Sequence, residues 1–182
     1  MVRMRILDVA RHKTDENTFH IVLLVTEDQS RMLPIFIGRH EAEVIALGAG
    51  KRELPRPLTM DLMLNLLEAA GASVAEVQVE SLRESTFYAA IKLRIGDAEK
   101  VVDARPSDAI ALALRTNSPI YASEAVLNRA GVAIRDEDRK GKKTLRGIDD
   151  LAKTIDEAIK AKAGPFVGFT LAELHIESLL SD

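Results

Sequence analysis

Apolar and polar positions along the first forty residues follow the pattern of paired strands. Met4–Ala10, Phe19–Thr26 and Met32–Ile37 are rich in aliphatic and β-branched residues, and the polar stretch Glu27–Ser30 between the last two is short. This pattern predicts three strands, of which the second and third form a hairpin. Pro34 has no backbone N–H to donate, so we expect it at an edge or a bulge of the sheet.

The apolar spacing then changes from that of strands to that of helices. After Gly38, apolar residues recur near one face, which predicts a short helix that ends at Gly48 or Gly50.

A second helix is predicted after the charged, proline-containing loop 51–57. Thr59 is placed as its N-cap and Gly71 as its end. Its buried stripe is expected to consist of Met63, Leu66, Leu67 and Ala70.

A second group of strands follows this helix. Ser73–Ser81 and Phe87–Ile95 alternate between apolar and polar residues, and the turn Arg83–Thr86 joins them, so we expect a second hairpin. A further short strand is predicted around Val101–Asp103.

The next stretch predicts a helix from residue 105 to 115, whose small apolar residues indicate that it is covered nearly all round. Ile120–Ala122 predicts a strand and Glu124–Ala130 a short helix. Because strands and helices do not alternate regularly, the fold class is α+β, with a largely antiparallel sheet and packed helices.

The last part of the chain differs in composition. Arg135–Arg146 is almost wholly polar and predicts a linker, whereas Ile148–Ile159 and Thr170–Leu180 predict helices, the second carrying His175. We therefore divide the chain into a domain at 1–134 and a charged linker with a helical C-terminal extension at 135–182.

Composition narrows the possible chemistry. The chain has 182 residues, 47% of them hydrophobic, and no cysteine, which excludes thiol nucleophiles, Cys-ligated zinc and disulfides. The start of the sequence lacks the features of a secretory signal, and no apolar run approaches the roughly 18 residues of a membrane span, so we expect a cytoplasmic protein without a membrane partner. The net charge of −3 gives no overall attraction to nucleic acid, so such binding needs a local basic patch.

Two groups of residues are candidates for a site, since no P-loop, HExxH or GxSxG motif is present. The first joins a strand to a helix and contains Asp103, Arg105, Ser107 and Asp108. Its carboxylates suit Mg²⁺ or Mn²⁺, and its arginine suits a phosphate. The alternative is purely structural: Ser107 caps the helix, Asp108 complements its dipole, and Asp103 pairs with Arg105.

The second group surrounds the start of the first helix. His40 is a candidate acid or base and Glu41 a metal ligand or base, while Arg39, Arg52 and Arg56 are candidate phosphate contacts. The alternative is an ordinary solvated helix start next to a charged loop. A basic loop at 139–143 could add phosphate affinity, or be a solvated loop.

Several ordered motifs resemble the bifunctional nuclease domain family. They are LPIFIGRHEAEVIALG, RPLTMDLMLNLL, VVDARPSDAIALALR and PIYASEAVL, and the resemblance extends from about Met1 to Val132. It implies a compact α+β domain that assembles into oligomers, in a family whose members are described as degrading both RNA and DNA.

The family's acidic, arginine and serine positions fall on the residues of the first group, and its other two motifs fall on short elements of this chain. The residues are Asp103, Arg105, Ser107 and Asp108; Ile37, Gly38, Glu41 and Ala42; and Arg56, Pro57 and Thr59. Where the family's pattern is expected to read Thr-His-Asp, this chain has Met60 before Asp61. A methionine cannot replace a histidine in proton transfer.

These observations favour a nuclease that cleaves RNA or DNA with a divalent cation, Mg²⁺ or Mn²⁺. Asp103, Asp108 and Glu41 would hold the metal. Arg105 and Arg56 would hold the phosphate, and His40 would move a proton. One alternative is a non-catalytic regulatory domain that binds an anion or a partner and forms oligomers. Another is a structural module that assembles a homo-oligomer through its C-terminal helices.

Overall fold

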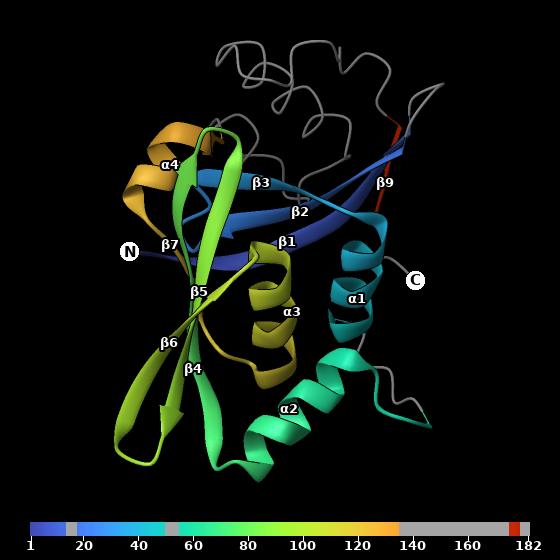
Figure 1. Ribbon diagram of the computed structural model, residues 1–182. Coiled ribbons are helices and arrows are strands. Elements are labelled where there is room, and N and C mark those ends of the chain that lie inside the picture. Colours follow the sequence, from blue (N-terminus) through green and yellow to red (C-terminus); the bar gives the residue numbers. More distant parts are fainter. Residues whose placement is uncertain (14–17, 50–54, 135–174, 179–182) are drawn as a thin grey trace.

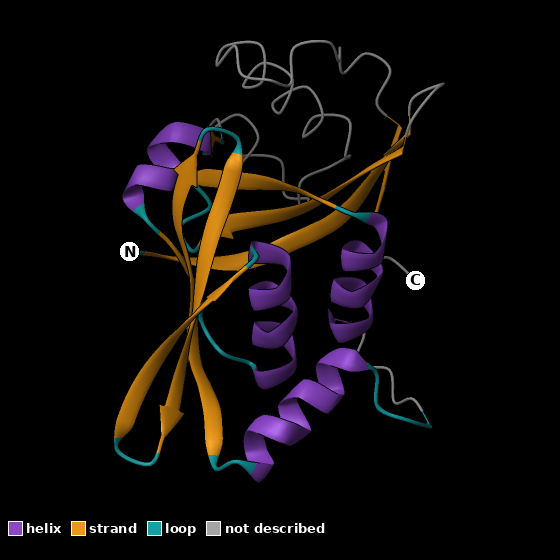
Figure 2. Ribbon diagram, viewed as in Figure 1, coloured by secondary structure: helices purple, strands orange, loops and turns teal. Residues whose placement is uncertain are grey.

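A computed structural model of the chain describes residues 1–13, 18–49, 55–134 and 175–178 (Figure 1). In chain order the strands are β1 (Val2–Lys13), β2 (Thr18–Thr26), β3 (Arg31–Ile37), β4 (Ala72–Arg83), β5 (Thr86–Ile95), β6 (Ala98–Ala104), β7 (Ile120–Ala122), β8 (Val132–Ala133) and β9 (His175–Ser178). The helices are α1 (Arg39–Ala49), α2 (Thr59–Ala69), α3 (Pro106–Thr116) and α4 (Glu124–Ala130). The predicted α+β class with packed helices is confirmed (Figure 2).

All the described strands belong to one sheet. Its order is β6-β5-β4-β7-β1-β2-β3-β8, and β9 pairs with β1 beside this path. Every pairing is antiparallel except that of β4 with β7. The three residues of β7 therefore join two antiparallel halves, one made of β4 to β6 and the other of β1 to β3 with β8.

The predicted strands are confirmed, and the structure shows why two of them have unusual sequences. Strand β2 is an almost continuous apolar run because its residues from His20 to Thr26 are buried on both faces of the sheet. Pro34 pairs with Leu23 of β2, and β8 pairs with β3 only at Arg31 and Met32. Pro34 thus lies on the part of β3 that β8 does not reach, where a missing N–H has no consequence.

Helices α1 and α3 lie side by side against the sheet (Figure 1). In α3 seven of eleven residues are buried, which confirms the expectation of a helix covered nearly all round. Pro106 occupies its first turn, where a missing N–H is tolerated, and Asn117 ends it in a left-handed conformation.

The rotation of α2 differs from the prediction. Met60, Leu64 and Leu67 pack against the core, whereas Met63 and Leu66 are 39% and 62% exposed. The N-cap is Leu58, not Thr59, and the Leu58 N–H donates to the Asp61 carboxylate over 2.9 Å. Leu67 of the predicted stripe is correctly placed, and Gly71 ends the helix at φ +70°.

The side chain of Asp61 fixes this rotation of α2. Its carboxylate accepts a hydrogen bond of 2.8 Å from Nε of Arg115 on α3. The guanidinium of Arg115 also donates to the carbonyls of Val44 on α1 and Ala111 on α3, so one cation links α1, α2 and α3. Helical spacing alone cannot reveal this constraint, because it depends on a residue 54 positions away.

The C-terminal part of the chain was predicted to be helical, but residues 175–178 form strand β9, which pairs with Ala10–Lys13 of β1. His175 therefore lies on a strand, not on an apolar helix. The predicted linker, the basic loop at 139–143 and the helix at 148–159 lie outside the described residues. The division at residue 134 stays a prediction. Within the described part of the chain, every helix is too short or too polar to cross a membrane.

Candidate functional site

The corner between β6 and α3 holds most of the residues predicted from the sequence. Arg105 is the N-cap of α3, and Pro106, Ser107 and Asp108 form its first turn. Ser107 is only 7% exposed, and it follows the N-cap by two positions. The expectation that Ser107 caps the helix is therefore wrong, whereas Asp108 does lie in the first turn, where its charge complements the helix dipole.

The guanidinium of Arg105 binds two carboxylates at this corner. Nη1 donates to Oε1 of Glu41 over 2.8 Å, while Nε and Nη2 donate to the two oxygens of Asp108 over 2.8 and 3.1 Å. These hydrogen bonds raise the pKa of Arg105, with Asp108 the larger cause. The structure thus brings together three predicted residues, Glu41, Arg105 and Asp108, which we call the corner triad. The triad is not sealed, since the Arg105 side chain is 65% exposed.

The position of Glu41 depends on the start of α1. A hydrogen bond from its own backbone N–H, and then Arg105, lower the pKa of Glu41. The carboxylate therefore folds back over the first turn of α1 towards Gly38. A Cβ atom on Gly38 would collide with Oε2 of Glu41, so the glycine makes room for this conformation.

Asp103 does not join the corner triad. It pairs with Ala90 of β5, whereas its neighbour Ala104 pairs with Ala89, a member of the core cluster beneath the helices. Because successive strand residues point to opposite faces, Asp103 lies on the face away from α3. The expected convergence of Asp103 with Asp108 is not found.

The three predicted metal ligands consequently do not form one cluster. Among the residues that the structure describes, no group of three His, Asp or Glu side chains lies close enough to hold an ion. Asp108 and Glu41 instead share the cation of Arg105. The donor set does not fit a divalent cation in this arrangement.

The remaining predicted residues lie near the starts of α1 and α2. Arg39 forms an ion pair of 2.8 Å with Glu43 one turn later, and the pKa of Glu43 is lowered by it. His40 is exposed beside them, and Arg56 is exposed in the segment before α2. Arg52 lies outside the described residues.

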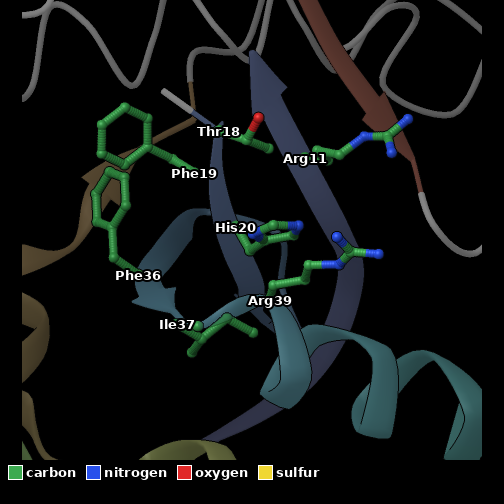
Figure 3. A pocket seen from close by; sticks show the side chains of 8 residues that line it. Arg11, Thr18, Phe19, His20, Phe36, Ile37 and Arg39 are labelled. Atoms are coloured by element: carbon green, nitrogen blue, oxygen red, sulfur yellow. The ribbon is translucent and has the colours of Figure 1, made fainter. Parts of the chain in front are cut away.

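A pocket of about 570 Å³ lies where β2 and β3 meet the start of α1 (Figure 3). Arg11, His20 and Arg39 contribute nitrogen-bearing side chains, and Phe19 and Phe36 contribute rings. In Figure 3 the two rings lie together on one side of β2, and His20 lies between them and the two arginines. The rings of Phe19 and Phe36 and the cations of Arg11 and Arg39 thus line one pocket at the end of the sheet, although the two rings lie on the other face of the sheet from His20.

The environment of His20 keeps its imidazole neutral. Burial lowers the pKa of His20 below its usual 6.5, and the charges of Arg11 and Arg39 lower it further. A neutral imidazole can accept a proton at pH 7. The pocket thus combines a base with guanidinium groups that suit phosphate.

The sequence did not reveal this pocket, apart from Arg39. Strand pairing brings its residues together: Arg11 of β1 lies opposite His20 of β2, and His20 lies opposite Ile37 of β3. The register of these strands cannot be read from residue spacing. The available signal was His20 itself, a polar residue that begins an otherwise apolar run.

Comparisons with known proteins agree with the motifs of the sequence. The model of the bifunctional nuclease domain family matches residues 22–135. An uncharacterized protein of Mycobacterium tuberculosis is 45% identical over 133 residues, which cover 73% of this chain and 79% of that protein.

Two plant proteins are more distant. Bifunctional nuclease 1 of Oryza sativa subsp. japonica is 27% identical over 135 residues, and bifunctional nuclease 2 of Arabidopsis thaliana is 25% identical over 127 residues. The matches cover 72% and 68% of this chain but 39% of each plant protein. With a family match over more than half of its length, this chain belongs to the bifunctional nuclease domain family.

Proposed function

We propose that this protein is a nuclease that hydrolyses phosphodiester bonds of RNA or DNA in the cytoplasm, and that its substrate binds in the pocket at the start of α1. The observation that carries the proposal is the meeting of Arg11, His20 and Arg39 with two phenylalanine rings in one pocket. Family membership and the names of the plant relatives support the reaction class.

Each group in the pocket has a role in this reaction. The guanidinium groups of Arg11 and Arg39 hold the phosphate and stabilise the negative charge that develops on it. The neutral imidazole of His20 accepts the proton of the attacking water as the new P–O bond forms. The bond to the leaving oxygen breaks, and that oxygen takes a proton from solvent water. Phe19 and Phe36 offer faces on which bases stack, a mode of binding that tolerates many sequences.

The corner triad has a supporting role in this proposal. Glu41 lies two residues after Arg39, and its ion pair with Arg105 holds the start of α1 against α3. Arg105 is a positioning residue in this proposal, since three of its five N–H groups already donate to carboxylates. The geometry does not support a cation held jointly by Asp103, Asp108 and Glu41. Whether cleavage needs Mg²⁺ or Mn²⁺ stays a prediction that the same assay tests.

The experiment is a cleavage assay of single-stranded RNA and DNA with Mg²⁺, with Mn²⁺ and with EDTA. The variants are His20→Gln and Arg39→Gln in the pocket, and Asp103→Ala as the control on the opposite face of the sheet. We expect kcat to fall about 100-fold or more for His20→Gln, the usual contribution of a general base. Circular dichroism of each variant verifies that it is folded.

The outcomes separate the two locations of the site. Loss of cleavage in His20→Gln with full activity in Asp103→Ala supports the pocket. Loss in Asp103→Ala with full activity in His20→Gln assigns the reaction to the face of the sheet that carries Asp103 and overturns the pocket proposal. Activity that disappears in EDTA and returns with Mg²⁺ or Mn²⁺ supports the predicted cation.

One observation favours a second function, a non-catalytic domain that binds an anionic ligand. In the corner triad the single cation of Arg105 is already paired with two carboxylates, and Met60 stands where the resemblance leads us to expect a histidine. This alternative predicts nucleic-acid binding that Arg39→Gln weakens, without cleavage of RNA or DNA under any of the three conditions.

A further inference from the structure

Part of the sheet has buried apolar residues on both of its faces. The buried aliphatic residues of α1, α3 and α4 belong to one core cluster, which also contains Val22 and Leu24 of β2. Among the described residues of β1, β2, β3 and β8, six buried apolar residues stand outside this cluster: Ala10, Ile21, Leu23, Val25, Met32 and Val132. Each of the six is at most 6% exposed. A contact other than the main core therefore buries them.

Strand pairing places all six residues on one face of the sheet. The opposed pairs are Ala10 with Ile21, Leu23 with Pro34, Val25 with Met32, and Met32 with Val132. Opposed residues of paired strands share a face, as do alternate residues of one strand. Val22 and Leu24, which alternate with the six along β2, face the helices. We call the other face of β1, β2, β3 and β8, which carries the six residues, the back face.

The back face needs a cover that the described helices do not provide, because these helices pack against the main core. Four parts of the chain lie outside the described residues: 14–17, 50–54, 135–174 and 179–182. Three of them have four or five residues, too few to cover a face of three strands. The fourth, 135–174, has forty.

We propose that residues 135–174 cover the back face, with the apolar stripe Ile148, Leu151, Ile155 and Ile159 packed against it. The occupant of this surface is thus a segment of the same chain. The inference is independent of the proposed nuclease activity. It concerns a segment that lies outside the family match, which ends at residue 135.

The two ends of this segment are held at opposite corners of the back face. Before it, the Ile134 N–H donates to the carbonyl of Ser30 over 2.9 Å, at the edge that β8 forms beside β3. After it, His175 lies opposite Lys13 at the far end of β1. Figure 1 shows β9 and α4, which precedes β8, at opposite ends of strands β1 to β3. Four strand spacings of ~4.8 Å and about eight residue rises of ~3.3 Å place the corners roughly 30 Å apart.

The length of the segment suits this path. Forty residues exceed the required distance even if all are helical, at ~1.5 Å per residue. The helix-bearing face between the two corners is already covered by α1 and α3. The back face is therefore the open route from β8 to β9.

The sequence of the segment suits the surface. Its four stripe residues recur at helical spacing, whereas Asp149, Lys153, Asp156 and Lys160 fall on the opposite side of the same helix. A helix with this pattern buries one side and exposes the other to water. Its apolar side matches a face on which the buried residues are also aliphatic or methionine.

Single cysteines test this cover, because the chain has no cysteine of its own. Leu23→Cys places a thiol on the back face, and the matched control Leu24→Cys places one on the helix-bearing face. Both leucines are 0% exposed. The probe is N-ethylmaleimide, added to the full chain at high and low protein concentration, with mass spectrometry as the readout. We expect both thiols to react slowly, since each must wait for a local opening of the structure.

A charge in the apolar stripe should release only one of the two faces. With Ile155→Asp added, we expect the Leu23→Cys thiol to react at least about tenfold faster and the Leu24→Cys thiol less than about twofold faster, because burial of a carboxylate is unfavourable. Lys153→Asp, on the opposite side of the predicted helix, should leave both rates unchanged. Val25→Cys and Val22→Cys repeat the comparison with a smaller loss of volume. Circular dichroism checks that each variant is folded.

The other outcomes overturn the proposal. An unchanged rate for Leu23→Cys with Ile155→Asp shows that the stripe does not cover the back face. Equal acceleration of both thiols shows that the segment supports the whole fold and not this face. Protection of Leu23→Cys that is lost on dilution assigns the face to a second copy of the chain. None of these readouts depends on cleavage activity, so this inference and the proposed function fail separately.

Discussion

Single residues determine the geometry on both sides of the start of α1. Gly38 leaves space for the carboxylate of Glu41, and His20 places a polar ring in an apolar row. Glu41, Arg105 and Asp108 could be predicted from the sequence, because they stand in compact motifs at the ends of elements. Arg11, Phe19, His20 and Phe36 could not, because they are brought together by strand register, which a single sequence does not reveal.

Replacing Gly38 by alanine should displace the carboxylate of Glu41 and break its ion pair with Arg105. We expect a loss of about 1 kcal/mol in the free energy of unfolding, since exposed pairs and N-cap positions each contribute that much or less. In a Glu41→Ala background the same change should cost only a few tenths, as no carboxylate remains to collide. Urea unfolding of the four proteins measures this coupling.

Gly131→Ala is the matched control for this cycle. A Cβ there would collide with the backbone carbonyl of Leu127, which cannot rotate aside. Gly131→Ala should therefore lower the free energy of unfolding by the same amount whether residue 41 is glutamate or alanine. An equal cost of Gly38→Ala in both backgrounds would contradict the role assigned to Gly38.

The lowered pKa of His20 makes the stability of the protein depend on pH in a defined direction. The unfolded chain takes up a proton near the usual pKa of 6.5, whereas the folded protein does so only at lower pH. Stability should therefore fall as the pH drops below about 6.5, by up to about 1.4 kcal/mol for each unit by which the folded pKa is lower. His20→Gln should remove this dependence.

Urea unfolding at several values between pH 7.5 and 5 measures the effect, and NMR titration of the imidazole reports its pKa directly. Bound phosphodiester should raise that pKa, because the anion offsets the charges of Arg11 and Arg39. A pKa of His20 at or above 6.5 in the free protein would refute the assigned environment.

At the scale of elements, the rotation of α2 shows what apolar spacing leaves undetermined. The predicted bounds of β4, β5, α3, β7 and α4 agree closely with the structure, because their patterns depend on local alternation and on proline and glycine positions. Strand β6 was predicted only around Val101–Asp103 and begins three residues earlier, at Ala98. The buried stripe of α2 was wrong, because the helix has apolar residues on several sides, and the ion pair of Asp61 with Arg115 decides which side faces the core.

Arg115→Met should remove the polar contacts that hold α2 against α1 and α3. The Arg115 side chain is largely buried, and Gly48 makes room for it, since a Cβ there would lie 2.6 Å from its Nη1. Without the guanidinium, the carbonyl of Val44 and the carboxylate of Asp61 lose their hydrogen-bond donor. We therefore expect the free energy of unfolding to fall by about 2–3 kcal/mol. Arg129→Met, an exposed arginine that also binds carbonyls, should cost less than about 1 kcal/mol.

The ion pair of Asp61 with Arg115 also makes the stability of the protein depend on pH, but through a carboxylate that an ion pair stabilises and not through a buried imidazole. Arg115, and then the N–H of Leu58, lower the pKa of Asp61 below its usual 3.8. The stabilisation is therefore present above about pH 3.8 and is lost as the pH falls through the lower folded value. The melting temperature of Asp61→Asn should equal that of the wild type only at acidic pH. If the variant still melts at a lower temperature there, the loss of stability comes from packing and not from the ion pair.

At the scale of the whole molecule, the charge balance makes nucleic-acid binding a local property. With a net charge of −3, the proposed attraction to nucleic acid must come from a local group of cations such as Arg11 and Arg39, against an unfavourable overall field. The ordered motifs that indicate the family lie within the first 135 residues, and only one of them, which contains residues 36–39, reaches the pocket.

Replacing Arg39 by glutamine should change how binding depends on salt. Each phosphate contact with a single strand contributes about −0.7 to the slope of log affinity against log salt concentration. We expect the slope for a labelled single-stranded oligonucleotide to become shallower by about that amount in Arg39→Gln. Fluorescence anisotropy at several salt concentrations measures it. An identical change in Arg94→Gln, an exposed arginine on β5, would show that the effect is not specific to the pocket.

The three-residue strand β7 has a consequence for how the chain folds. Apart from the pairing of β8 with β3, the two antiparallel halves of the sheet consist of hairpins between neighbouring segments, which close quickly because their loops are short. Their union waits for Ile120–Ala122 to meet Val2–Met4, more than a hundred positions away. Contacts between such distant segments slow folding. We thus expect the pairing of β7 with β1 to form late in folding, after the main free-energy barrier. The amide hydrogens of β7 should be among the last to gain protection from exchange during refolding.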